Sequence, residues 1–157
     1  MPKITPFLWF DTQAKEAADF YCDVFGGKVG EVTYYSEAGP GPKGSVLTVR
    51  FDLGDFEVVA LNGGPAHYNF SEAFSLAVAC KSQEEVDYFW GRLSEAGEEG
   101  QCGWLKDRYG LSWQIVPSAL PELLSRGDPA TTERVMRAMF QMKKLELAVL
   151  EKAASQP

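Results

Sequence analysis

The chain has 157 residues, enough for one well-buried domain or two small fused modules, and its 45% hydrophobic and 13% aromatic content is that of a globular protein. A net charge of −7 and a pI near 4.8 argue against a nucleic-acid or anionic-membrane partner, because both select a basic surface. No apolar run approaches the roughly 20 residues that span a bilayer, and the first residues lack the apolar core of a signal peptide. The three cysteines (Cys22, Cys80 and Cys102) show no metal-type or redox-type spacing, which predicts reduced thiols in the cytoplasm.

The first half of the chain predicts a β-α-β-β-β module. Residues 4–10 are an apolar and aromatic run typical of a strand. Helical spacing of small and aromatic residues follows up to Phe25, with Asp11 or Thr12 as the N-cap and Gly26-Gly27 as the end. Alternating and β-branched residues then predict three strands, at 29–35, 45–53 and 56–61, with a Gly- and Pro-rich loop at 37–44.

The same pattern restarts in the second half. Residues 74–80 are an apolar strand, Ser82 and Glu85 fit a helical capping box, and the helix ends near Gly97. Further strands are predicted at 98–105 and 111–116. The order of elements repeats that of the first half, which predicts an α+β fold of two β-α-β-β-β modules whose curved mixed sheets surround a cavity. Module one is assigned to residues 1–66, module two to 67–117, and a C-terminal helical extension to 118–157.

Residues 102–117 predict a β-hairpin that closes module two. Asp107 and Gly110 suit a four-residue turn, since Asp bonds its own backbone and Gly accepts a positive φ. Alternation along the second strand puts Leu111, Trp113 and Ile115 on one face, and Ser112, Gln114 and Val116 on the other. We therefore expect the first face to pack in the hydrophobic core, and the second face to line a cavity that carries a few polar side chains.

The C-terminal extension predicts one long helix over residues 132–153. It carries two apolar stripes, and a helix of this kind must be covered on both. One stripe would pack on its own domain and the other on a partner chain, or both would lie inside a larger monomer core.

Four stretches of the chain are similar to one family. They are Ala60-Leu61-Asn62-Gly63-Gly64-Pro65, Glu85-Val86-Asp87-Tyr88-Phe89-Trp90, residues 102–117, and Met139-Phe140-Gln141-Met142-Lys143-Lys144. They resemble the vicinal oxygen chelate superfamily (glyoxalases, bleomycin resistance proteins and dioxygenases), and within it the PhnB-like branch labelled 3-demethylubiquinone-9 3-methyltransferase-like. The resemblance implies helix-backed curved sheets with a cavity on the concave side, and a homodimer.

The resemblance also implies where a metal would bind, because metal-dependent members place His and Glu at matched strand positions. In this chain those positions hold Ser75 and Gln114 in module two, and Thr5-Pro6 and Thr48 in module one. None of these is a strong ligand for a divalent ion, and His67 is the single histidine. We therefore expect no catalytic metal and no cofactor.

Eight residues are candidates for contacts with a ligand, and most of them have a plainer alternative. Gln114 and Ser75 either bind a ligand or form a satisfied polar pair, and Arg50 either clamps an anion or is solvated at an edge. His67 either works in acid-base chemistry or is plain surface, and Trp104 lines a pocket or belongs to the core. Asn62 begins a turn that resembles a phosphate loop only weakly, because no helix follows it. The full set is Thr48, Arg50, Asn62, His67, Phe70, Ser75, Trp104 and Gln114, with Tyr68 and Phe70 as possible covers for the cavity.

The sequence therefore favours a small-molecule-binding protein for an aromatic or amphipathic metabolite. The alternative is an enzyme of the superfamily: a glyoxalase-like lyase or isomerase, a dioxygenase-like protein, or the methyltransferase of the family label. No Gly-rich strand-to-helix turn supports the methyltransferase. A third hypothesis is a dimerisation or scaffold role for the C-terminal helix.

Overall fold

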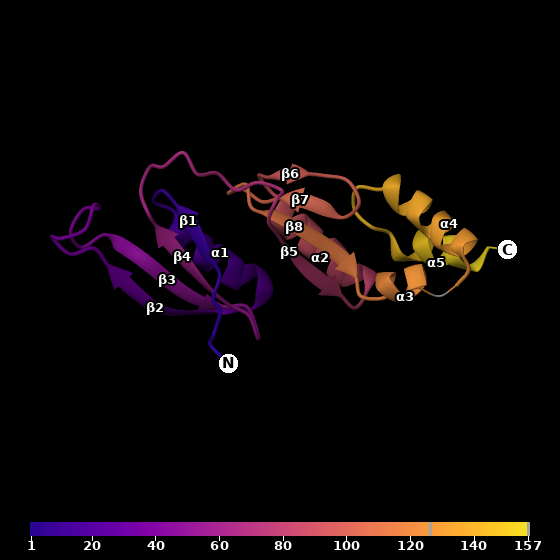
Figure 1. Cartoon of the computed structure of the whole chain (residues 1–157), viewed down its shortest axis with the longest axis horizontal. Coiled ribbons are helices and arrows are strands. Elements are labelled where there is room, and N and C mark those ends of the chain that lie inside the picture. The colour runs from indigo at the N-terminus through magenta and orange to yellow at the C-terminus, as the bar shows by residue number, and fades with distance from the viewer. Residues whose placement is uncertain (126, 157) are drawn as a thin grey trace. The chain divides into compact units, whose positions relative to one another are not determined.

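The structure, a computed structural model, describes residues 1–125 and 127–156. The chain divides into two compact units, Met1–Tyr68 and Asn69–Pro157, and each is described separately (Figure 1). No helix in the described residues combines the length and the apolar character needed to cross a bilayer.

The first unit is a four-stranded mixed sheet with one helix. Strand β1 is parallel to β4, β3 is antiparallel to both β4 and β2, and the spatial order is β1-β4-β3-β2. The elements are β1 (Phe7–Phe10), α1 (Ala14–Phe25), β2 (Lys28–Tyr34), β3 (Val46–Asp52) and β4 (Glu57–Asn62).

Helix α1 packs on one face of this sheet and leaves the other face open. Its buried side is rich in alanine, which lets the helix lie close to the strands, and the ring of Tyr21 stacks on Phe51 at 6.0 Å. The sheet residues on the helix side are buried: Leu8, Phe10, Val49, Phe51, Val58 and Ala60. The opposite side, which we call the open face of the first sheet, carries Phe7, Trp9, Thr48 and Arg50 by alternation from these residues.

The predicted N-cap of helix α1 is wrong, because neither Asp11 nor Thr12 caps it. The helix begins at Ala14, and the Gln13 side chain makes no capping bond. Instead the amide oxygen of Asn62, at the end of β4, accepts a hydrogen bond of 2.8 Å from the Ala14 N–H. The Asn62 Nδ2 donates to the carbonyl of Val46 at 3.2 Å, so one side chain joins α1, β4 and β3.

Replacing Asn62 by alanine is expected to lower the free energy of unfolding by about 1–3 kcal/mol, since it removes the cap and leaves buried backbone groups unpaired. Urea unfolding followed by far-UV circular dichroism measures this loss. Thr12→Ala is the matched control and is expected to change stability by less than about 0.5 kcal/mol. A larger loss for Thr12→Ala than for Asn62→Ala would contradict the assignment of the cap.

The second unit repeats this topology, as the sequence predicted. Its sheet has the order β5-β8-β7-β6, with β5 parallel to β8 and the remaining pairs antiparallel. The elements are β5 (Ser75–Cys80), α2 (Gln83–Ser94), β6 (Glu98–Glu99), β7 (Trp104–Lys106) and β8 (Ser112–Pro117). The α+β class and the duplicated β-α-β-β-β module are therefore confirmed.

Two local predictions in this unit have different outcomes. The cap of α2 is confirmed, since the Ser82 hydroxyl accepts from the Glu85 N–H at 3.2 Å. The continuous strand at 98–105 is wrong, because a turn separates β6 from β7. The φ angles of Cys102 (57°) and Gly103 (84°) are positive, which a strand does not allow.

The hairpin between β7 and β8 has the predicted turn and the predicted faces. The Gly110 N–H donates to the Asp107 carbonyl at 2.9 Å, and Gly110 has a φ of 83°. Leu111, Trp113 and Ile115 are buried. The Asp107 side chain, 2% exposed, also organises the turn: its Oδ1 accepts from the N–H groups of Tyr109 (2.8 Å) and Leu111 (3.1 Å), and its Oδ2 from the Trp113 indole (2.9 Å).

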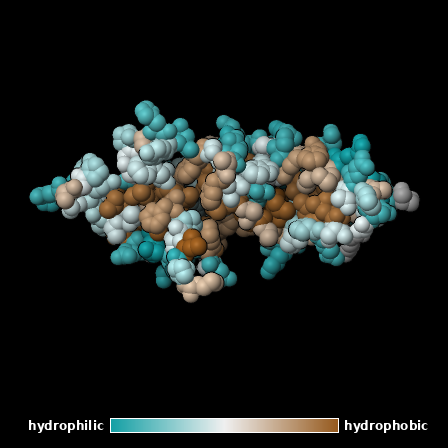
Figure 2. Space-filling model, in the orientation of Figure 1, coloured by the Kyte–Doolittle hydropathy of each residue, from teal (hydrophilic) through white to brown (hydrophobic). Residues whose placement is uncertain are grey.

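The single long helix predicted over residues 132–153 is wrong, because this range is divided between α4 (Pro129–Phe140) and α5 (Leu147–Ser155). A short helix, α3 (Leu120–Ser125), comes before them. The apolar residues of this C-terminal segment pack mainly on one another, and the five buried residues of the cluster are Leu120, Leu123, Val135, Leu145 and Leu150. Met136 and Phe140 stay exposed, and Figure 2 shows hydrophobic atoms at the surface over these helices.

Residues 141–146, which we call the latch, explain why the helix breaks. The carbonyls of Met142 and Lys143 accept hydrogen bonds of 2.8 Å from the N–H groups of Cys102 and Gly103. The side chain of Gln83 donates to the Leu145 carbonyl (3.0 Å) and accepts from the Leu147 N–H (2.7 Å). These tertiary bonds replace the i to i−4 bonds of a continuous helix.

Candidate functional site

The open face of the second sheet brings three predicted site residues together. Strand register places Ser75 beside Ser112, and Gln114 between Ala77 and Trp104. The Gln114 Nε2 donates to the Ser75 hydroxyl at 2.9 Å. Ala77 and Ala79 on the same face are exposed. This side of the sheet is therefore open to solvent next to the Ser75–Gln114 pair.

Ser112 is the member of this face that the sequence prediction did not select. It is 1% exposed, and its hydroxyl is the one buried side-chain oxygen without a hydrogen-bond partner among the described residues. It lines a hollow of about 140 Å³ together with Trp104, Lys106 and Glu72. Its position two residues before Gln114 on one strand face was the signal available in the sequence.

An ion pair lies at the same hollow. The Lys106 Nζ is 2.7 Å from a carboxylate oxygen of Glu72. The hydrogen bond from Lys106 lowers the pKa of Glu72, and the same bond raises the pKa of Lys106. Both groups are therefore charged at neutral pH and neutralise each other, so the hollow takes no net charge from this pair.

The two candidates on the open face of the first sheet already have polar partners. The Thr48 and Thr33 hydroxyls are hydrogen-bonded to each other, and Arg50 donates to the Glu57 carboxylate. Glu57 also contacts Lys3 at 2.9 Å. The hydrogen bonds from Lys3 and Arg50 lower the pKa of Glu57, which keeps it ionised at neutral pH. An anion at Arg50 would therefore compete with this carboxylate.

The loop after β4 packs on Trp9, as expected for a turn. The Trp9 indole donates to the Gly64 carbonyl at 3.2 Å, and the Tyr68 ring meets Trp9 edge-on at 5.3 Å. A Cβ on Gly63 would lie 2.1 Å from the Trp9 ring, so this position requires glycine. His67 is exposed in the same loop, and Phe70, half-buried, lies in the second unit.

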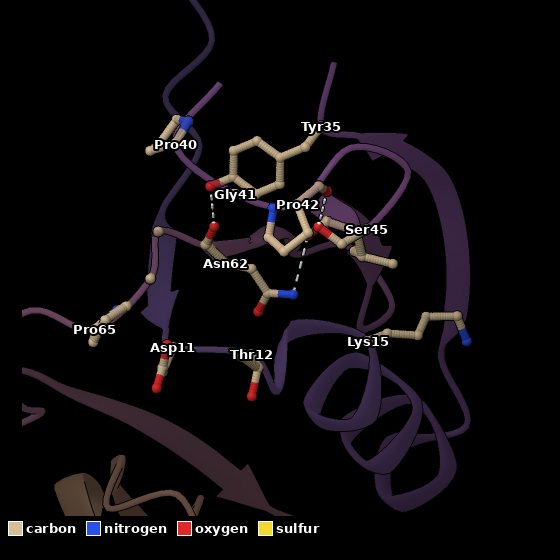
Figure 3. Close-up of a pocket in the computed structure, with 13 residues that line it drawn as sticks. Asp11, Thr12, Lys15, Tyr35, Pro40, Gly41, Pro42, Ser45, Asn62 and Pro65 are labelled. Atoms are coloured by element: carbon tan, nitrogen blue, oxygen red, sulfur yellow. Dashed lines mark hydrogen bonds between the residues drawn. The ribbon is translucent and has the colours of Figure 1, made fainter. Parts of the chain in front are cut away.

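Asn62 lines a different cavity, of about 530 Å³, at the ends of β1 and β4 in the first unit (Figure 3). Its side chain lies on the helix side of the sheet, away from Thr48 and Arg50. The structure therefore separates Asn62 from Thr48 and Arg50.

The residues at the positions that bind metal in the superfamily do not fit a divalent cation. Ser75 and Gln114 bond each other, and Thr48 bonds Thr33. Within residues 1–125 and 127–156, no group of three or more His, Cys, Asp or Glu side chains is placed to hold a metal ion. Hydroxyl and amide groups offer weak ligands where imidazole and carboxylate are needed.

Fold and open faces together define a glyoxalase-like protein of the vicinal oxygen chelate superfamily, the class that the sequence resemblance indicated. The sequence profile of the family described as 3-demethylubiquinone-9 3-methyltransferase matches residues 2–116, and the chain belongs to this family. No curated protein matches the chain.

Solved structures agree with this assignment. A PhnB protein from Bacillus cereus is 33% identical over 74% of this chain and 99% of its own, with a TM-score of 0.67. Protein PA1353 from Pseudomonas aeruginosa is 22% identical (73% and 96% covered, TM-score 0.62). The fosfomycin resistance protein FosX from Listeria monocytogenes, solved with Mn(II) and sulfate, is 14% identical (80% and 96% covered, TM-score 0.55). The last two show a shared fold.

Proposed function

We propose that this chain binds a small organic molecule on the open face of its second sheet, without a metal ion. The observation that carries the proposal is the buried Ser112 hydroxyl, which has no hydrogen-bond partner among the described residues and lines a hollow. Leaving a buried hydroxyl unpaired costs about 1–3 kcal/mol. A ligand atom that bonds Ser112 removes this cost, so the site favours an occupant with a polar group.

The surroundings favour an aromatic or amphipathic ligand. Trp104 offers an aromatic surface on one side of Gln114, and the exposed Ala77 on the other side leaves room for a planar ring. Gln114 can both donate and accept hydrogen bonds. The Lys106–Glu72 pair adds no net charge, and the carboxylates of Glu98 and Glu99 also line the hollow. This lining favours a ring with one or two hydroxyl or carbonyl groups over an anionic ligand.

The family description names a quinone-type aromatic substrate, which agrees with this ligand class, and methyl transfer is the second candidate function. FosX from Listeria carries Mn(II), but the donor set on this chain supports binding by hydrogen bonds instead.

We also propose a homodimer in the cytoplasm. The exposed aromatic side chains Phe7 and Trp9 on the open face of the first sheet support a second copy as their cover. The three cysteines, all free thiols, support a reducing compartment. Size-exclusion chromatography with light scattering tests the dimer, and a monomer at 50 micromolar protein (about the scale at which weak dimers form) would contradict it.

The proposed site makes a two-sided prediction for Ser112→Ala. Without ligand the variant is expected to be as stable as the parent or more stable by up to about 1 kcal/mol, because the unpaired hydroxyl is removed. Binding of a phenolic probe is expected to weaken about fivefold or more, through loss of one hydrogen bond. Saturation-transfer NMR with 4-hydroxybenzyl alcohol, 2,6-dimethoxyphenol and indole on the full chain measures binding, and thermal unfolding measures stability.

Two further variants complete the test. Gln114→Leu is expected to weaken the binding of the phenolic probes more than that of indole. The substitution removes the hydrogen-bonding amide group and keeps a side chain of similar size. Ser118→Ala, at an exposed serine just beyond β8, is the matched control and is expected to change neither property. Equal saturation transfer for Ser112→Ala, Gln114→Leu and Ser118→Ala would contradict the proposed site.

A further inference from the structure

We infer that the cavity beside Asn62 in the first unit is a second ligand site, built for a small organic ammonium compound with an apolar body. Its volume, about 530 Å³, is within the usual range for small-molecule sites. It opens where β1 and β4 end and helix α1 begins. This inference is independent of the proposed function, which concerns the second unit.

The cavity is distinct from the open face of the first sheet. Asn62 follows Ala60 on the helix side of β4, and its amide oxygen faces the first turn of α1. Thr48 and Arg50 lie on the opposite side. A ligand beside Asn62 therefore contacts the ends of β1 and β4 and the adjoining loops, and it leaves the open face of the first sheet free.

The wall of the cavity is preformed by the loop between β2 and β3. The Tyr35 N–H donates to the Ser45 carbonyl and the Gly44 N–H to the Tyr35 carbonyl, both at 2.9 Å, and the Tyr35 hydroxyl donates to the Asn62 carbonyl. A Cβ on Gly39 or Gly41 would come within 2.5 Å of the Tyr35 ring. The loop is thus fitted around this ring, and binding does not have to order it.

Most of the lining is apolar and rigid. Pro40 and Pro42 lie near the Tyr35 ring, Pro65 also lines the cavity, and Figure 3 shows Asn62 between Tyr35 and the pair Asp11 and Thr12. Proline rings and a tyrosine ring favour a flat apolar group over a strongly hydrated one. The body of the ligand is therefore apolar.

The charge at the cavity favours a cation. Lys15 is neutralised by Asp19, whose two carboxylate oxygens both lie 2.6 Å from its ammonium. Asp11 has no ion pair with any described residue, so its carboxylate is the uncompensated charge of the lining. At the start of the helix, the Ala14 N–H already donates to Asn62 and is not available to a ligand.

Benzylamine, benzyl alcohol and benzoate test the inference, since they share one ring and differ in charge. Titrations of the isotope-labelled full chain, followed by two-dimensional amide NMR, are expected to shift the resonances of Gly41, Gly63 and Gly64. Benzylamine is expected to bind about fivefold more tightly than benzyl alcohol, and benzoate most weakly. Asp11→Asn is expected to remove the advantage of the amine.

Asp55→Asn is the matched control, because Asp55 is an exposed carboxylate on the β3–β4 turn of the same unit. It is expected to keep the preference for the amine. Equal affinity for the three probes, an unchanged preference in Asp11→Asn, or tightest binding of benzoate would each overturn the inference. The reporting amides belong to the first unit, so these results stand apart from the Ser112→Ala test.

Discussion

Replacing Asp107 by alanine is expected to lower the free energy of unfolding by about 3–5 kcal/mol, a larger loss than removal of the Asn62 cap causes. The carboxylate is buried and accepts hydrogen bonds from Tyr109, Leu111 and the Trp113 indole. Alanine leaves these three donors unpaired inside the hairpin of β7 and β8. Because domains are stable by only about 5–15 kcal/mol, such a loss approaches complete unfolding of the second unit.

The conservative variant Asp107→Asn separates the contribution of the two backbone hydrogen bonds from that of the Trp113 indole bond. Its amide oxygen can still accept from Tyr109 and Leu111, but its NH2 group faces the Trp113 N–H, and two donors do not bond. We expect Asp107→Asn to have a free energy of unfolding between those of Asp107→Ala and the parent. Urea unfolding followed by tryptophan fluorescence measures it. Asp55→Ala, in the corresponding β3–β4 turn of the first unit, is exposed and serves as control, with a change below about 0.5 kcal/mol. Similar losses at the two aspartates would contradict this account.

Leu145→Ala is expected to release the C-terminal helices from α2 and the β7–β8 hairpin, and to lower the free energy of unfolding by about 2–5 kcal/mol. Leu145 lies in the latch, is 1% exposed, and belongs to the cluster that holds α3, α4 and α5 together. Its side chain also lies against Gly103, where a Cβ would come 3.0 Å from it. Its removal therefore opens a cavity where the latch meets the β7–β8 hairpin.

Hydrogen exchange with mass spectrometry measures this release. The amide groups of Cys102 and Gly103, and those of α4 and α5, are expected to exchange faster in Leu145→Ala, while the first unit is unchanged. Val149→Ala, at an exposed position of α5, is the control and is expected to keep the parental pattern. Protection that stays at the parental level in Leu145→Ala would show that the latch bonds alone hold the segment.

The duplicated topology could be predicted because strand and helix periods are local properties. Alternation along β8 placed Leu111, Trp113 and Ile115 on the buried face, and the capping pattern at Ser82 located α2. The cap of α1 could not be found in this way, since Asn62 lies 48 residues after Ala14 in the chain. The break at the latch was missed for the same reason: its hydrogen bonds come from Gln83, Cys102 and Gly103.

The candidate site was predicted in part. Strand alternation brought Ser75 and Gln114 to one face, and the structure joins them by a hydrogen bond. Thr48 and Arg50 do share a face, but their partners Thr33 and Glu57 come from neighbouring strands that no spacing in the sequence pairs with them. The unpaired state of Ser112 depends on what surrounds it in space, so no pattern in the sequence could reveal it.

The latch also leads to an expectation about the order in which the chain acquires its structure. Its docking partners on α2 and the β7–β8 hairpin lie well before it in the sequence, so they leave the ribosome first and can fold while the latch is still being synthesised. The five buried residues of α3, α4 and α5 are too few to form a stable core alone. We therefore expect the C-terminal helices to assemble last, on an already folded sheet, and Leu120 and Leu123 to stay exposed until then.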